Sequence, residues 1–163
     1  MKAIKFLALT SFVLTSFNCF GDDGAKLFGI ESASIIAESV SVKACRTVGS
    51  RTLSPPEYFE KARDSLNVST NLARRLSQVL LNEKSYEFSN SSTGSCVLQP
   101  IVAITYSDGK RDVDVYFCFD CTVLVVKSQT KEVGNRFGPS RAELVQIIKE
   151  IFPDDSQIQS LKE

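Results

Sequence analysis

Two cysteines separated by two residues are the feature of this chain with the clearest chemical potential. Cys118-Phe119-Asp120-Cys121 lies in the segment 112–126, where apolar residues at alternate positions are typical of a strand with one buried face. Such a Cys-x-x-Cys pair can serve thiol redox chemistry, haem attachment or zinc binding. Because four extended residues span roughly 10 Å, the two cysteines can bridge each other only if the strand turns or bulges between them.

The neighbouring residue types restrict these alternatives. The chain has no histidine, and Thr122 follows Cys121, so the haem attachment motif is absent. A thioredoxin-type site needs its first cysteine at a helix N-terminus, whereas β-branched strand formers follow here. Cys45, Cys96 and Cys118 could join Cys121 in a four-thiolate zinc site, although Cys45 and Cys96 are isolated and offer no second Cys-x-x-Cys. Zinc binding and thiol redox chemistry therefore remain alternatives.

The sequence offers little else that supports catalysis. Neither of the glycine-rich phosphate-binding motifs, G-x-x-x-x-G-K and G-x-G-x-x-G, occurs in the chain. Asp112, Asp114 and Asp120 would share one strand face, which is more typical of a solvated sheet surface than of a catalytic site. We therefore assign no catalytic residue and no cofactor, and we expect the protein not to be an enzyme.

The N-terminus has the features of a secretion signal, which is predicted over residues 1–18. Lys2 and Lys5 supply the positive charge, and the apolar run of residues 6–17 is too short to span a bilayer. The protein is therefore predicted to be exported to the cell envelope, as a membrane-anchored lipoprotein or as a periplasmic or extracellular protein.

The role of Cys19 differs between two possible routes of signal-peptide cleavage. Cleavage before Cys19 would leave a lipidated cysteine, followed by a tether over residues 19–34 and a single globular domain over 35–163. Ordinary cleavage after Gly21 is the other route. We favour lipidation, which makes a lipid anchor the expected contact with the membrane.

Loss of the two signal lysines leaves about two net negative charges, which does not favour nucleic acid as a partner.

The mature chain keeps four cysteines: Cys45, Cys96, Cys118 and Cys121. An even number in an oxidising compartment favours two disulfides, for which three connectivities exist.

The hydrophobic pattern predicts an α+β domain with a mainly antiparallel sheet, a central β-hairpin and helices packed on one face. Strands are expected over residues 35–48, 96–106 and 112–126, and a turn over 134–138. Capping signals predict helices that begin at Ser54-Pro55-Pro56-Glu57, at Ser69 or Thr70, and at Pro139-Ser140-Arg141. One more short turn is expected in the tail after Pro153.

Asp108-Gly109 is the signature of a two-residue hairpin turn, which would pair Ser107 with Lys110. Continued along the strands, this register places Cys121 opposite Cys96 and gives both strands one apolar face. A Cys96–Cys121 disulfide is therefore predicted. Cys118 would point to the opposite face, where it pairs with Cys45 or stays free.

The segment Cys96-Val97-Leu98-Gln99-Pro100, together with Cys118-Phe119-Asp120-Cys121 and Phe152-Pro153-Asp154-Asp155, resembles a family of small exported bacterial proteins of uncharacterised function. The similarity covers about residues 39–161. The resemblance implies that Cys96, Cys118 and Cys121 are shared and that Cys45 is not, which leaves three thiols to share one bridge or to bind a metal. It implies no activity.

Taken together, the sequence predicts an exported lipoprotein that acts as a non-enzymatic binding or structural module. Its partner would be an unknown protein or another envelope ligand.

Overall fold

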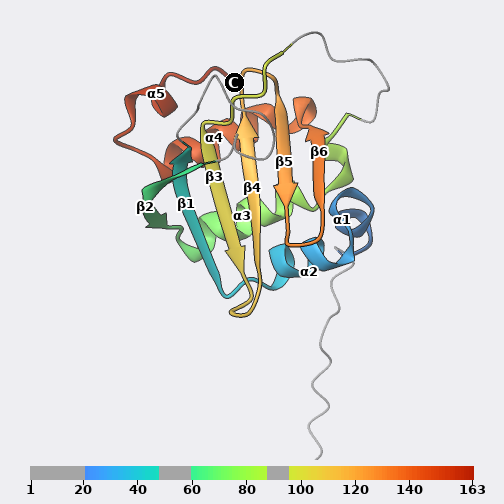
Figure 1. The fold of residues 1–163 in the computed structure, drawn as a ribbon. Coiled ribbons are helices and arrows are strands. Elements are labelled where there is room, and N and C mark those ends of the chain that lie inside the picture. Colours follow the sequence, from blue (N-terminus) through green and yellow to red (C-terminus); the bar gives the residue numbers. More distant parts are fainter. Residues whose placement is uncertain (1–20, 48–59, 88–95) are drawn as a thin grey trace, which may run out of the picture.

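The computed structural model describes residues 21–47, 60–87 and 96–163 (Figure 1). The signal peptide, Cys19 and the start of the helix predicted at Ser54 lie outside these residues. None of the helices in the described ranges is long and apolar enough to cross a membrane.

A six-stranded sheet forms the centre of the fold, and every pair of neighbouring strands is antiparallel. Its spatial order is β2-β1-β3-β4-β5-β6, so the β3–β4 hairpin is central, as predicted. The strands are β1 (Ser41–Thr47), β2 (Lys61–Asn67), β3 (Val102–Ser107), β4 (Asp112–Cys118), β5 (Val123–Lys127) and β6 (Glu132–Arg136). The predicted α+β class with an antiparallel sheet is confirmed.

Within the described residues, the sheet is accompanied by five α-helices: α1 (Gly21–Phe28), α2 (Ile30–Glu38), α3 (Thr70–Leu80), α4 (Arg141–Ile151) and α5 (Ser156–Gln159). The same ranges contain the short 3-10 turns η2 (Glu83–Ser85) and η3 (Gly138–Ser140). The helices predicted at Ser69 and Arg141 and the short turn in the tail are confirmed. Ser69 caps α3 by accepting the Leu72 N–H, but Ser140 does not cap α4, because its hydroxyl donates to the carbonyl of Ser85 at 3.1 Å.

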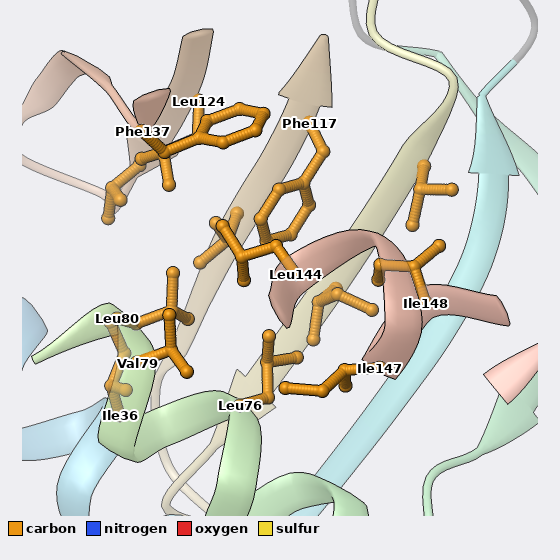
Figure 2. Close-up of a cluster of buried hydrophobic side chains, with 14 of the residues drawn as sticks. Ile36, Leu76, Val79, Leu80, Phe117, Leu124, Phe137, Leu144, Ile147 and Ile148 are labelled. Atoms are coloured by element: carbon orange, nitrogen blue, oxygen red, sulfur yellow. The ribbon is translucent and has the colours of Figure 1, made fainter. Parts of the chain in front are cut away.

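The main hydrophobic core lies between one face of the sheet and the helices. Alternate residues of the central strands, such as Ile104, Val115 and Phe117, are fully buried there. They share one cluster with buried side chains of α2, α3 and α4, several of which are drawn in Figure 2: Ile36, Leu76, Leu80, Leu144, Ile147 and Ile148. Burial of this apolar area is the main force that fixes the sheet in place.

Three element predictions were wrong. Residues 35–48 were expected as one strand, but α2 occupies their start and β1 begins at Ser41. The helix predicted to begin at Ser54 does not extend into residues 61–67, which form strand β2. The turn expected over 134–138 is mostly strand β6. For β2 and β6, which are edge strands with mostly exposed or half-buried residues, pairing with a neighbouring strand overrides a weak local signal.

The tether prediction is also wrong for residues 21–34. These residues form α1 and the first half of α2, and Leu27 and Phe28 are buried in the main core. The folded domain therefore includes the chain from Gly21 onward. Only Phe20 separates Cys19 from the first residue of α1 in the sequence.

The hairpin faces were predicted correctly, but its register is shifted by two residues. Ser107 pairs with Asp112 and Val102 with Phe117, because the carboxylate of Asp108 accepts the N–H groups of Lys110 and Arg111 at 2.8 Å and widens the loop. A two-residue shift keeps every side chain on its face, because side chains alternate with a period of two. Pro100 precedes β3 rather than lying within it, which explains how an interior strand tolerates a nearby proline.

Candidate functional site

The Cys-x-x-Cys segment is a turn between two strands rather than part of one. β4 ends at Cys118 and β5 begins at Val123, so the single strand predicted over residues 112–126 is wrong. The Thr122 N–H donates to the Phe119 carbonyl at 3.2 Å, and Thr122 has a φ of 53°. Turns of this kind normally use glycine or asparagine at such a φ, so a threonine there does not indicate a turn.

The turn is fixed by contacts on both sides. The Phe119 ring is buried against the rings of Phe117 and Phe137, with centroids 5.9 and 5.5 Å away. Arg141, the first residue of α4, donates to the Phe119 carbonyl at 2.5 Å and to the Lys162 carbonyl at 3.0 Å. Its guanidinium also lies 5.8 Å from the centre of the Phe119 ring. These contacts hold Cys121 in one place.

Cys96 and Cys121 form the predicted disulfide, with Cα atoms 5.8 Å apart. The reason differs from the predicted one. Cys96 precedes β3 and Cys121 follows β4, so neither lies in the paired part of the hairpin. The two-residue shift of the register moves Cys121 away from Cys96 along the hairpin. The turn after Cys118 brings it back, so the two cysteines still meet.

The expected second disulfide is absent, because Cys45 and Cys118 are both free and buried. Cys45 lies in a small cluster with Ala103, Tyr116 and Val125, on the sheet face opposite the main core. Burial raises the pKa of the Cys45 thiol, against a smaller opposite effect of Lys61. The Cys118 sulfur accepts the backbone N–H of Gln99 at 3.4 Å. A buried, protonated thiol is a poor nucleophile, so Cys45 is not suited to redox catalysis.

Polar residues form a second cluster on this sheet face. Asp114 accepts hydrogen bonds from Thr105 at 2.7 Å and from Tyr116 at 3.3 Å, and it also pairs with Lys61. The interaction with Asp114 raises the pKa of Tyr116 further, beyond the larger effect of burial. These groups satisfy one another's hydrogen-bonding capacity and charge, which is typical of a structural network.

A cleft of about 470 Å³ lies beside the disulfide. Its lining residues come from the segment before β3, the cysteine turn and the two strands at that edge: Cys96, Leu98, Asp120, Cys121, Val123, Gly134, Asn135 and Arg136. Gly134 pairs with Val125 and has no side chain to fill the space, since a Cβ there would meet nothing closer than 3.8 Å. The volume falls within the range of small-molecule sites.

Two polar residues border this cleft. The Arg136 guanidinium lies 3.7 Å from the Glu87 carboxylate and is about one-third exposed. The Asn135 side-chain nitrogen is buried and has no hydrogen-bond partner. Asn135 pairs with Leu124 of the main core, so its side chain lies on the sheet face opposite Gly134 and Arg136. The cleft can therefore offer an apolar wall and the donors of Arg136.

A metal site does not form from the predicted ligands. Within residues 21–47, 60–87 and 96–163, no three histidine, cysteine, aspartate or glutamate side chains are grouped as metal ligands. The Cys96–Cys121 bond occupies two of the four sulfurs that the zinc alternative requires.

Sequence reasoning found the cysteines of this region but missed Gly134, Arg136 and Arg141. Gly134 was read as a turn residue, and an isolated arginine carries no positional signal. Comparison with known protein families, with curated proteins and with solved structures finds no match. The region is therefore interpreted from its own geometry.

Proposed function

We propose that this protein is an exported lipoprotein of the cell envelope, anchored through Cys19, and that it acts as a non-enzymatic binding module. The Cys96–Cys121 bond is the observation that carries the proposal, because disulfides persist in oxidising compartments and are rare in the cytosol. The apolar run that precedes Cys19 is consistent with export.

The cleft beside the disulfide is the proposed binding site. It combines an apolar wall, formed by Leu98 and Val123, with the guanidinium donors of Arg136. Such a site suits a ligand that carries an apolar group next to hydrogen-bond acceptors. The bridge keeps the segment before β3 next to the cysteine turn and so preserves the shape of the cleft.

Lipidation is tested by changing Cys19. Wild-type protein is expected in the membrane fraction, and Cys19→Ser protein in the soluble envelope fraction. Cys118→Ser, which keeps Cys19, is the matched control and should stay with the membrane. If Cys19→Ser protein remains membrane-bound, or if the mature chain starts at Asp22, the lipoprotein proposal is wrong.

Binding in the cleft is tested with the dye 1-anilinonaphthalene-8-sulfonate, which has an apolar ring system and one anionic group. Its emission is expected to increase with the wild-type protein and with Gly134→Ala. Gly134→Leu should abolish the increase, because the position has room for a side chain that fills the cleft. Equal emission for all three proteins would place dye binding elsewhere and remove the support for this site.

The rival redox function predicts turnover in an insulin-reduction assay. We expect none, because Cys118 is buried at the end of a strand, where its sulfur accepts the Gln99 N–H and a substrate disulfide cannot reach it. Turnover that Cys118→Ala abolishes would make the protein an enzyme.

A further inference from the structure

Helix α2 presents an uncharged, partly apolar stripe to solvent. Its inner side is buried through Ala33, Ile35 and Ile36, as expected for a core helix. On its outer side Ile30 is 80% exposed and Ala37 is exposed, with half-buried Ser34 between them. These three positions are separated by four and three residues and therefore lie on one face of the helix. A surface helix normally places charged residues there.

Val40 adds a second large exposed apolar side chain just beyond the end of α2. It is 76% exposed, and its N–H donates to the Ser107 carbonyl at 2.9 Å, next to the β3–β4 loop. Ile30 and Val40 are two of the four large hydrophobic residues that the described part of the chain exposes. Isolated exposed residues need no explanation, but two on one short segment indicate a contact surface.

The stripe lies at one end of the sheet, where two hairpins turn. Glu31 of α2 accepts a hydrogen bond from Arg111 in the β3–β4 loop at 3.0 Å and one from Thr130 in the β5–β6 loop at 3.4 Å. Figure 1 shows α2 and the β3–β4 loop at the lower end of the molecule, and the C-terminus at the upper end. Glu31 thus fixes α2 across the tips of both hairpins.

Charges at this end cancel one another. α2 and the two loops, residues 108–111 and 128–131, carry three acidic and three basic residues: Glu31, Glu38, Asp108, Lys110, Arg111 and Lys131. Arg111 is held between Asp108 at 2.8 Å and Glu31 at 3.0 Å. The end is therefore suited to an uncharged surface rather than to an acidic or basic partner.

The position of the proposed lipid anchor identifies that surface. Cys19 lies two residues before α1, and two extended residues span about 7 Å at most. α1 packs directly on α2, where a Cβ added to Gly24 would lie 3.2 Å from Ala33. A lipid on Cys19 would therefore hold this helix pair against the bilayer.

We propose that the α2 stripe of Ile30, Ser34, Ala37 and Val40 lies in the interface of the phospholipid membrane that carries the anchor. This inference rests on the proposed lipidation of Cys19. The helix lies parallel to the bilayer surface, with Ile30 and Val40 inserted at the boundary between the headgroups and the acyl chains. The cysteine turn follows the far end of β4, so the cleft beside the disulfide opens away from the membrane.

Single tryptophan substitutions test this orientation, because the chain contains no tryptophan of its own. Ile30→Trp and Val40→Trp report on the stripe. Val97→Trp is the matched control, since Val97 is 70% exposed and adjoins the disulfide at the other end of β4. Each lipidated variant is reconstituted into phosphatidylcholine vesicles whose acyl chains carry bromine. Ile30→Trp and Val40→Trp should lose most of their emission and shift to shorter wavelength, whereas Val97→Trp should keep its emission.

Two further measurements distinguish a failure of the lipoprotein proposal from a failure of the docking inference. The intact mass shows whether Cys19 is lipidated, and an unmodified mass overturns the lipoprotein proposal alone. The chain from Cys19 onward is then coupled to a diacyl maleimide through Cys19, so that docking is tested without cellular lipidation. Unquenched Ile30→Trp and Val40→Trp on such anchored protein overturn the docking inference. Quenching that requires anionic lipid, or that disappears in high salt, contradicts the uncharged interface. Blue-shifted emission without vesicles would instead assign the stripe to self-association.

Discussion

The Cys118 sulfur lies 3.4 Å from the backbone nitrogen of Gln99 and accepts its N–H. A free thiol is therefore packed beneath the segment that leads from the disulfide into β3. Cys118 is three residues from Cys121 in sequence, yet it lies on the sheet while Cys121 lies in the turn that carries the bridge. The two cysteines of the Cys-x-x-Cys segment thus have separate structural roles.

Thiol reactivity should reflect this separation. In the native oxidised protein, Cys45 and Cys118 should not react with Ellman's reagent, because both are buried. In guanidinium chloride both should react at once. Rapid reaction of the native protein, lost in Cys118→Ala, would show that Cys118 is accessible and would support a redox role.

Loss of the disulfide should destabilise the fold. The bridge joins residues 25 apart, and closing a loop of that length stabilises a protein by about 3 kcal/mol in the chain-entropy model. Cys96→Ala, Cys121→Ala and the double variant should each lose about this amount in guanidinium unfolding. Because each change removes the same bond, the double variant should be no less stable than the single ones. Additive losses would mean that the two side chains act independently.

Two buried tyrosines should respond differently to loss of their hydroxyl. The Tyr86 hydroxyl donates to the Leu80 carbonyl at 2.8 Å, so Tyr86→Phe should cost about 1 kcal/mol in thermal or chemical unfolding. The Tyr106 hydroxyl is buried and has no partner of normal geometry, although the nearby Ser77 hydroxyl slightly opposes the increase in pKa caused by burial. Tyr106→Phe should therefore leave stability unchanged or raise it. A larger loss for Tyr106→Phe than for Tyr86→Phe would refute this assignment.

Stability should fall in alkaline solution. Burial raises the pKa of Cys45 above 9.0 and the pKa of Tyr86 and of Tyr106 above 10.0, their ordinary values. The folded protein keeps these protons after the unfolded chain releases them, so their stabilising effect is complete below pH 9 and is lost as the pH rises further. The free energy of unfolding, measured from pH 7 to 11, should decline above about pH 9. Tyr86→Phe/Tyr106→Phe should show a shallower decline, and an identical slope would exclude the tyrosines as its cause.

The arginine that holds the cysteine turn should be needed for its geometry. Arg141→Lys keeps the charge but cannot reach the Phe119 and Lys162 carbonyls with a planar fork. The variant should stay folded, and its Cys96–Cys121 bond should be reduced more readily by dithiothreitol than in wild type. Unchanged reduction would mean that packing of Phe119 alone fixes the turn.

Several features of this fold could be predicted from sequence because a strong periodic signal coincided with the final packing. The stripes of α3 and α4 specify helices, and the alternating residues of β3 and β4 specify which face is buried. The register could not be predicted, because Asp108-Gly109 allows a two-residue turn and only the Asp108 side-chain contacts select the wider loop.

The remaining errors share a cause in long-range contacts. Ile35 and Ile36 suggest a strand, but α2 is stabilised by burial against the core. Gly134-Asn135 suggests a turn, but the neighbouring strand β5 pairs with it. The cysteine pair was predicted correctly for a reason that the structure does not support, since two local errors cancelled. The cleft could not be predicted at all, because its lining comes from three separate segments.

Export, lipidation and the disulfide are tested together by the intact mass of the natively exported protein, before and after reduction, followed by a peptide map without reduction. We expect a chain that begins at Cys19 and carries a diacylglyceryl group. We also expect a mass increase of two hydrogen atoms on reduction and a single linked peptide pair that contains Cys96 and Cys121. A chain that begins at Asp22, a Cys118–Cys121 linkage, or four free thiols with one bound zinc ion would contradict these expectations.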